Sequence, residues 1–190
     1  MATTQKVNPA KIVTGLVRLS YINAFAPRKD EETGRESYSV CILIPKSDTA
    51  SVAKIQAAID HVKNSPESQS TWGTKWLASY KNPLRDGDTE RDTEASPEYK
   101  GHWFINCNSS QKPGVVDANV QPILDQSELY SGCYGKVSVL FYPYKQKGGI
   151  GIAAGLNNIQ KIKDGERLGG RSNPEEDFSV EAEETADFMG

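Results

Sequence analysis

The feature that most constrains the fold is a set of segments in which apolar residues recur at every second position. Residues 11–25 carry apolar side chains of one parity, namely Val13, Val17, Leu19, Tyr21 and Phe25. Residues 36–46 repeat the pattern, as do 101–109, 135–144 and the start of 149–163. A period of two predicts β-strands with one buried face. Since no helix separates these segments regularly, a parallel α/β sheet is disfavoured.

One longer block separates the second segment from the third. Residues 48–63 have an apolar stripe of helical period, and Ser65–Pro66 predicts the start of a second helix. The apolar face of that second helix is predicted to be Trp72, Trp76, Leu77 and Tyr80. We therefore predict a mainly β chain, an OB-fold or small Greek-key barrel with a helical insertion after the second strand. Residues 82–101 are predicted to be loop.

Charge divides the chain into a basic body and an acidic tail. The whole chain has a net charge of −3, yet residues 174–190 hold seven carboxylates and no Lys or Arg. Residues 1–173 therefore carry 22 basic against 18 acidic residues. A segment this acidic is predicted to be disordered, and a basic body favours polyanionic partners. We expect a nucleic-acid-binding domain over 1–173 and a disordered tail over 174–190.

Aromatic residues on the polar strand faces are the candidates for base stacking. Tyr142 and Tyr144 lie opposite the apolar parity of their strand, as does Phe104 in its own. Lysines accompany them along the chain: Lys100, Lys145 and Lys147. The turn cations Arg28, Lys29 and Arg35 are candidates for the same groove. Aromatic rings on a basic sheet face predict single-stranded nucleic-acid binding without sequence preference. The alternatives are rings packed under the helical insertion and solvated turn charges.

Other chemistries find little support in the sequence. Zinc-site and nucleotide-loop motifs are absent, so no catalytic residue, metal or cofactor is predicted. Cys41, Cys107 and Cys133 lie in apolar runs and are expected to be reduced packing residues. No apolar run is long enough to cross a bilayer and no secretory signal is visible, which predicts a cytosolic protein.

Several stretches, in this order, resemble a family of phage single-stranded DNA-binding proteins long catalogued only as a domain of unknown function. They are GLVRLSYINAFAP, YSVCILIPKSD, NPLRDGDT, ELYSGCYGKVSVLFYPY and GLNNIQKIKDGERLGG. The most specific are YSGCYGKVSV and NIQKIKDGERLGG. The resemblance implies an OB-fold and single-stranded DNA binding in replication or recombination, in the cytoplasm of the host cell. Single-stranded DNA-binding proteins often end in an acidic tail with a late aromatic residue, a place that Asp187 and Phe188 fill here.

The tail is then expected to compete with DNA for the basic groove and, once displaced, to recruit replication or recombination proteins. A tail that only improves solubility is the simpler alternative. Two other functions stay open: a metal-dependent nuclease using Asp86, Asp88 and Asp92, and an adaptor whose acidic tail mimics DNA. The sequence leaves the oligomeric state open, a homo-oligomer included.

Overall fold

The computed structural model describes residues 7–73 and 79–169. The segment predicted as one strand over 11–25 forms two, β1 (Lys11–Val13) and β2 (Val17–Lys29). The other predicted strands are confirmed as β3 (Glu36–Pro45), β5 (His102–Ser109), β7 (Tyr134–Gln146) and β8 (Gly149–Lys163). A further short strand, β6 (Gly114–Val116), precedes β7, and Val116 bridges Pro122.

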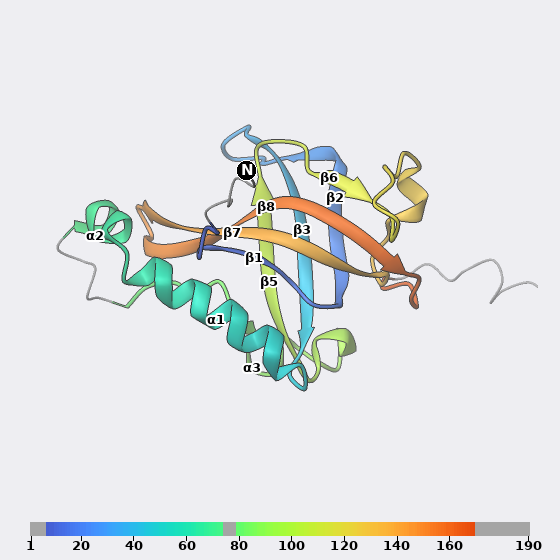
Figure 1. Ribbon diagram of the computed structural model, residues 1–190, viewed down its shortest axis with the longest axis horizontal. Coiled ribbons are helices and arrows are strands. Elements are labelled where there is room, and N and C mark those ends of the chain that lie inside the picture. The colour runs from blue at the N-terminus through green and yellow to red at the C-terminus, as the bar shows by residue number, and fades with distance from the viewer. Residues whose placement is uncertain (1–6, 74–78, 170–190) are drawn as a thin grey trace, which may run out of the picture.

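Five of these strands close into a barrel. Hydrogen-bonded neighbours follow the order β7–β2–β3–β5–β8, and β8 pairs again with β7. All of these pairings are antiparallel except β5 with β8, where Cys107 lies opposite Ala154. Strands β1 and β6 extend the sheet beside β7 and β8 (Figure 1). This five-stranded Greek-key barrel is the architecture predicted from the sequence.

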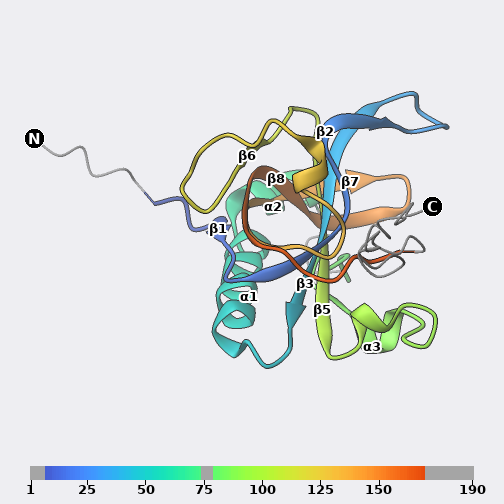
Figure 2. The same cartoon turned by 90° about the vertical axis from the view of Figure 1, so that its right-hand side faces the viewer.

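The helical insertion lies between β3 and β5, as predicted. Helix α1 (Thr49–Lys63) begins at Asp48, whose carboxylate accepts the Ser51 backbone N–H at 3.1 Å. Its residues Ile55, Ile59 and Val62 are buried in the barrel core. Figure 2 shows α1 on one side of the barrel and the segment carrying α3 on the other. In the described residues no helix is both long and apolar enough to span a membrane.

Helix α2 (Pro66–Trp72) begins with the predicted Ser65 cap but ends earlier than expected. Trp72 is fully buried, stacks on Tyr80 with ring centroids 5.7 Å apart, and donates its indole N–H to the Tyr144 carbonyl at 3.1 Å. The helix therefore supports the β7–β8 hairpin, which reaches toward it in Figure 1. Trp76 and Leu77, predicted for the same face, lie outside the described residues.

The predicted loop 82–101 contains short regular elements. Strand β4 (Arg85–Asp86) pairs with Phe104 and Trp103 of β5, and α3 (Gly87–Glu90) follows it at once. A single 3-10 turn, Pro97–Tyr99, then leads back into β5. The segment covers part of the outer face of the barrel. A second small cluster, Cys41, Leu43, Tyr99 and Phe104, is buried beneath it.

The three cysteines are free and buried, as expected of packing residues. Cys107 belongs to the main core and Cys41 to the small outer cluster. Burial raises the pKa of the Cys41 thiol to about 11, so this sulfur stays protonated at neutral pH.

Candidate nucleic-acid interface

Tyr142 and Tyr144 lie on the outer face of β7, above glycines of β8. A Cβ on Gly151 would fall 2.6 Å from Cζ of Tyr144, and one on Gly155 would fall 3.3 Å from Cε1 of Tyr142. The two rings therefore pack directly against the backbone of the glycine-rich run of β8, where side chains would displace them. Tyr142 is 43% exposed and Tyr144 is half-buried. Their predicted position on the solvent side of the strand is confirmed.

Next to these rings, a row of small polar side chains crosses the outer face of the barrel. Asn23 of β2 pairs with Ser39 of β3, Ser39 with Asn108 of β5, and Asn108 with Gly155 of β8. The amide of Asn23 also donates to the Ser39 hydroxyl at 3.0 Å. Because these side chains are short and uncharged, they leave the middle of the outer face open, and their polar groups can hydrogen-bond a ligand there.

Three adjoining hollows follow this face, and we call them together the groove. The hairpin hollow, about 670 Å³, is lined by Tyr144, Lys81 and Arg85. It shares Asn106 and Asn108 with the central hollow, about 310 Å³. The central hollow shares Tyr21 with the terminal hollow, about 650 Å³, which ends at residues 166–169. The groove therefore runs from the β7–β8 hairpin over β5 and β3 to β2.

The groove is basic. Its cationic lining residues are Arg18, Arg28, Lys81, Arg85, Arg91 and Arg167. Its acidic lining residues are Glu90, Glu98 and Glu166. Arg85 and Glu90 form an ion pair at 3.1 Å, and the side chain of Arg18 is bonded to the carbonyls of Gly132 and Glu166. An excess of cations in a concave site attracts polyanions.

The other predicted cations fall at different distances from this groove. Arg28 lines the central hollow, and Lys29 lines a separate hollow by the β2–β3 turn, where Arg35 is also exposed. Lys145 and Lys147 are exposed at the β7–β8 tip, beyond Tyr144. Lys100 lies at the opposite end of the sheet from the β2–β3 turn, since neighbouring His102 pairs with Pro45 at the far end of β3. The structure therefore separates Lys100 from the turn cations.

The prediction that Phe104 is on a solvent face is wrong. Its side chain is fully buried, with Tyr99 packed edge-on at 5.2 Å. The guanidinium groups of Arg85 and Arg91 each lie 4.9 Å from the ring centroid. The parity of β5 is regular, but the 82–101 segment folds over this face and covers the ring. A covered ring cannot stack on a base.

The prediction for Tyr21 is also wrong, in the opposite sense: its parity places it on the apolar face of its strand, whereas its side chain is exposed. A shift of register between Ser20 and Asn23 makes it an extra residue in β2, with φ of +46° and its side chain 64% exposed. Such a conformation costs a non-glycine residue about 1–3 kcal/mol. The backbone N–H of Tyr21 donates to Ser131 Oγ at 3.0 Å. A bulge cannot be read from alternation, and only the polar Asn23, which stands in the apolar parity between Tyr21 and Phe25, signals it.

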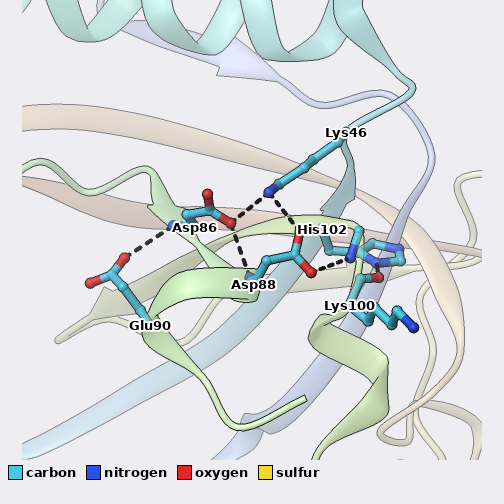
Figure 3. Close-up of polar contacts among 7 residues, drawn as sticks. Lys46, Asp86, Asp88, Glu90, Lys100 and His102 are labelled. Carbon is cyan, nitrogen blue, oxygen red and sulfur yellow. Dashed lines mark hydrogen bonds and ion pairs between the residues drawn. The ribbon is translucent and has the colours of Figure 1, made fainter. Parts of the chain in front are cut away.

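Two acidic residues of the 82–101 segment, Asp86 and Asp88, form ion pairs with Lys46 (Figure 3). Lys46 Nζ lies 2.6 Å from Asp86 Oδ1 and 2.7 Å from Asp88 Oδ2. Asp88 also accepts the Gly101 backbone N–H at 3.0 Å. The Lys46 side chain lowers the pKa of both carboxyl groups. Within residues 7–73 and 79–169, no group of three or more His, Cys, Asp or Glu side chains could hold a metal ion.

Asp187 and Phe188, predicted to bind partner proteins, lie outside the described residues, as does the rest of segment 170–190.

Comparison with known proteins shows the family of this chain. A family model described as "Enterobacter phage Enc34, ssDNA-binding protein" matches residues 10–189. The p50 protein of Acyrthosiphon pisum secondary endosymbiont phage 1 is 32% identical over 188 residues, covering 92% of this chain and 97% of that protein.

Solved structures share the fold. The single-stranded DNA-binding protein from bacteriophage Enc34 in complex with ssDNA superposes with a TM-score of 0.71 at 24% identity, covering 87% of this chain and 97% of that one. For gp2.5, a single-stranded DNA binding protein encoded by bacteriophage T7, the TM-score is 0.60 at 13% identity, with 86% and 97% covered. The family model spans nearly all of the chain, which therefore belongs to the family of the Enterobacter phage Enc34 ssDNA-binding protein.

Proposed function

We propose that this protein binds single-stranded DNA without sequence preference, during phage DNA replication or recombination in the cytoplasm of the host cell. The observation that carries the proposal is the groove: a continuous basic channel with tyrosines, crossing the outer face of a Greek-key barrel. Membership of a family described by ssDNA binding supports the same assignment.

The chemistry of the groove suits an unpaired strand. Stacking of a base on an aromatic ring contributes about 1–3 kcal/mol and is available to every base, because every base has a π-face. Tyr142 and Tyr144 offer such rings beside the hairpin hollow, and Lys145 and Lys147 lie just beyond them for phosphate contacts. The asparagines of the floor can both donate and accept hydrogen bonds, so they tolerate any base edge.

We propose a binding role rather than catalysis. The nuclease alternative needs Asp86 and Asp88 free to hold a divalent cation, whereas the Lys46 ammonium occupies the space between the two carboxylates. Asp92 instead accepts backbone N–H groups of Glu94 and Ala95 within its own turn. This arrangement supports a structural role for all three carboxylates, which stabilise the segment that covers Phe104.

For residues 174–190 we propose competition with DNA and recruitment of partner proteins. The described chain reaches Gly169 on the wall of the terminal hollow, so the acidic segment is tethered beside the groove. Tethering gives it a high effective concentration at the cations that DNA would contact. DNA that fills the groove displaces the segment, which leaves Asp187 and Phe188 available to a partner.

Photo-cross-linking tests where DNA binds. An oligo-dT carrying 5-iododeoxyuridine is irradiated with the full-length protein, and the cross-linked peptides are identified by mass spectrometry. We expect cross-links in the β7 peptide that carries Tyr142 and Tyr144, and an intact oligonucleotide after incubation with Mg²⁺. Cross-links confined to α1 or to the β6–β7 connection would contradict the groove. Cleavage that is lost in Asp88→Ala would favour the nuclease instead.

A further inference from the structure

We infer that Tyr21 is the stacking residue of a second nucleotide subsite, on β2, which binds a base of the same strand that Tyr142 and Tyr144 hold. The inference rests on the proposed function and extends it. Tyr21 is the residue shared by the central and terminal hollows, and its ring is the most exposed of the tyrosines that line the groove.

The backbone around Tyr21 is built to turn this ring outward. The extra residue in β2 moves Tyr21 off the core face, while Leu19 before it and Ala24 after it are buried. The shape is held from outside the strand, because Ser131 Oγ accepts the Tyr21 N–H and the Leu19 carbonyl accepts the Gly132 N–H at 2.8 Å. An exposed tyrosine kept at positive φ by its surroundings indicates a functional role rather than a packing role.

The two stretches that most specifically resemble the phage family contact each other next to Tyr21. YSGCYGKVSV supplies Ser131 and Gly132, and NIQKIKDGERLGG supplies the segment that packs on them. Gly165 donates its N–H to the Tyr130 hydroxyl at 3.1 Å, and Leu168 donates its N–H to the Ser131 carbonyl at 2.9 Å. Arg18 ties the same two stretches together through the carbonyls of Gly132 and Glu166. Together the two stretches hold the Tyr21 bulge in place and line the terminal hollow.

Charge and polarity around Tyr21 fit a nucleotide. Arg28 and Arg91 line the central hollow on one side of the ring, and Arg167 lines the terminal hollow on the other. Guanidinium groups pair with phosphate oxygens through two parallel hydrogen bonds. Asn23 lies beside the ring on the floor of the central hollow, within reach of a base edge.

The distance between the two subsites also fits one strand of DNA. From β7 to β2 the path crosses β8, β5 and β3, which are four interstrand spacings of about 4.8 Å, or about 19 Å across the sheet. It also shifts about 10 Å along β8, from Gly151 opposite Tyr144 to Ala154 opposite Cys107. A barrel of this kind contacts about 4–16 nucleotides. A strand that stacks on Tyr144 at one end therefore reaches Tyr21 at the other without leaving the groove.

The test measures, by fluorescence anisotropy, the affinity of full-length protein for a fluorescein-labelled oligo-dT of about 10 nucleotides, the middle of that range. The variants are Tyr21→Ala, Tyr21→Phe and Tyr21→Gly. Glycine accepts the positive φ, so Tyr21→Gly removes the ring without backbone strain and guards against a folding defect. Val120→Ala is the matched control, because Val120 is also exposed at positive φ (+61°) but lies after β6, outside the lining of the groove.

We expect Tyr21→Ala and Tyr21→Gly to raise Kd about 5- to 150-fold, the loss of one stacked base. Tyr21→Phe and Val120→Ala should bind like the wild type, and all variants should keep the wild-type dependence of log Kd on log salt. Tyr144→Ala is measured beside them. If Tyr21→Ala binds like the wild type while Tyr144→Ala loses affinity, the Tyr21 subsite is overturned and the proposed function still holds. An equal loss in Tyr21→Phe also overturns it. Absence of binding by the wild type overturns both.

Discussion

Gly151 determines how the Tyr144 ring lies in the hairpin hollow. A methyl group at this position would come within 2.5 Å of the Tyr144 phenol oxygen and 2.7 Å of Cε1, so the ring must move. The cost to the fold is small because the displaced atoms are the far end of a side chain, and Gly151 does not require positive φ.

We therefore predict that Gly151→Ala weakens oligo-dT binding by about 1 kcal/mol or more, roughly fivefold, while the barrel stays folded. Gly148→Ala is the control in the same hairpin, since the nearest atom to its added Cβ would be Lys81 Nζ at 3.5 Å. Anisotropy gives the affinity and thermal unfolding gives the stability. Equal affinity of Gly151→Ala and Gly148→Ala would mean that the position of the Tyr144 ring does not matter.

Single residues also show how far sequence reasoning reaches. Alternation placed Tyr142 and Tyr144 correctly because β7 is regular there and its inward residues are apolar. It failed for Tyr21, where one extra residue reverses the parity, and for Phe104, where a distant segment covers the outer face. Alternation reports the pleat of a strand, and neither a bulge nor a covering segment is encoded in it.

At the scale of elements, Lys46 fastens the covering segment to the barrel. It follows the last residue of β3, and its ammonium joins Asp86 of β4 to Asp88 of α3 while lying 5.1 Å from the Trp103 ring centroid. Because the pKa of each carboxyl is lowered from 3.8, the folded state binds fewer protons than the unfolded chain in acid. This contribution to stability is present above the ordinary carboxyl pKa and is lost as pH falls through the lowered values.

We predict that the melting temperature of the wild type drops more between pH 6 and pH 3 than that of Lys46→Met, which has no ion pair to lose. Lys54→Met is the control, since Lys54 Nζ donates to the Val13 carbonyl at 3.0 Å, an acceptor that does not titrate. Circular dichroism melts measure the three proteins. Parallel acid shifts in wild type and Lys46→Met would show that Lys46 does not fasten the segment.

The elements that sequence located well are those with local signals. The strands have their period, α1 has its Asp48 cap, and α2 has Ser65 and Pro66 at its start. The segment 82–101 was predicted to be loop because it is polar and acidic. Its regular pieces arise from pairing with Phe104 and Trp103 of β5 and from the Lys46 ion pairs, all of which are contacts between distant positions.

At the scale of the whole molecule, barrel closure creates the groove. The parallel pairing of β5 with β8 brings Asn108 beside Gly155, and the β2–β3–β5 pairings continue that surface to Asn23. Counting strands predicts a barrel class, but it does not say which outer face is hollowed. The groove depends on where the segments between β3 and β5 pack. Helix α1 lies on one side of the barrel and the segment carrying α3 on the other (Figure 2). Residues of that second segment line the hairpin and terminal hollows.

The cations that line the groove, rather than the net charge of −3, give DNA binding its dependence on salt. The six cations that line the groove would by themselves give a slope of about −4 for log affinity against log salt with a single strand, and contacts from Lys145 and Lys147 would make the slope steeper. We propose that the acidic segment 174–190 competes with DNA for these cations, and salt would screen that competition as well. Its removal should therefore tighten binding most at low salt.

The most direct test of the central claim is an anisotropy titration of labelled oligo-dT with the full-length protein and with residues 1–173, across a range of salt concentrations. We predict binding by both forms that weakens with salt, tighter for residues 1–173 at low salt, and similar for a mixed-sequence oligonucleotide. Equal affinities of the two forms at every salt concentration would refute competition by the tail but would leave the groove as the DNA-binding site. No binding by either form, or binding that salt does not change, would contradict the groove as a site for single-stranded DNA.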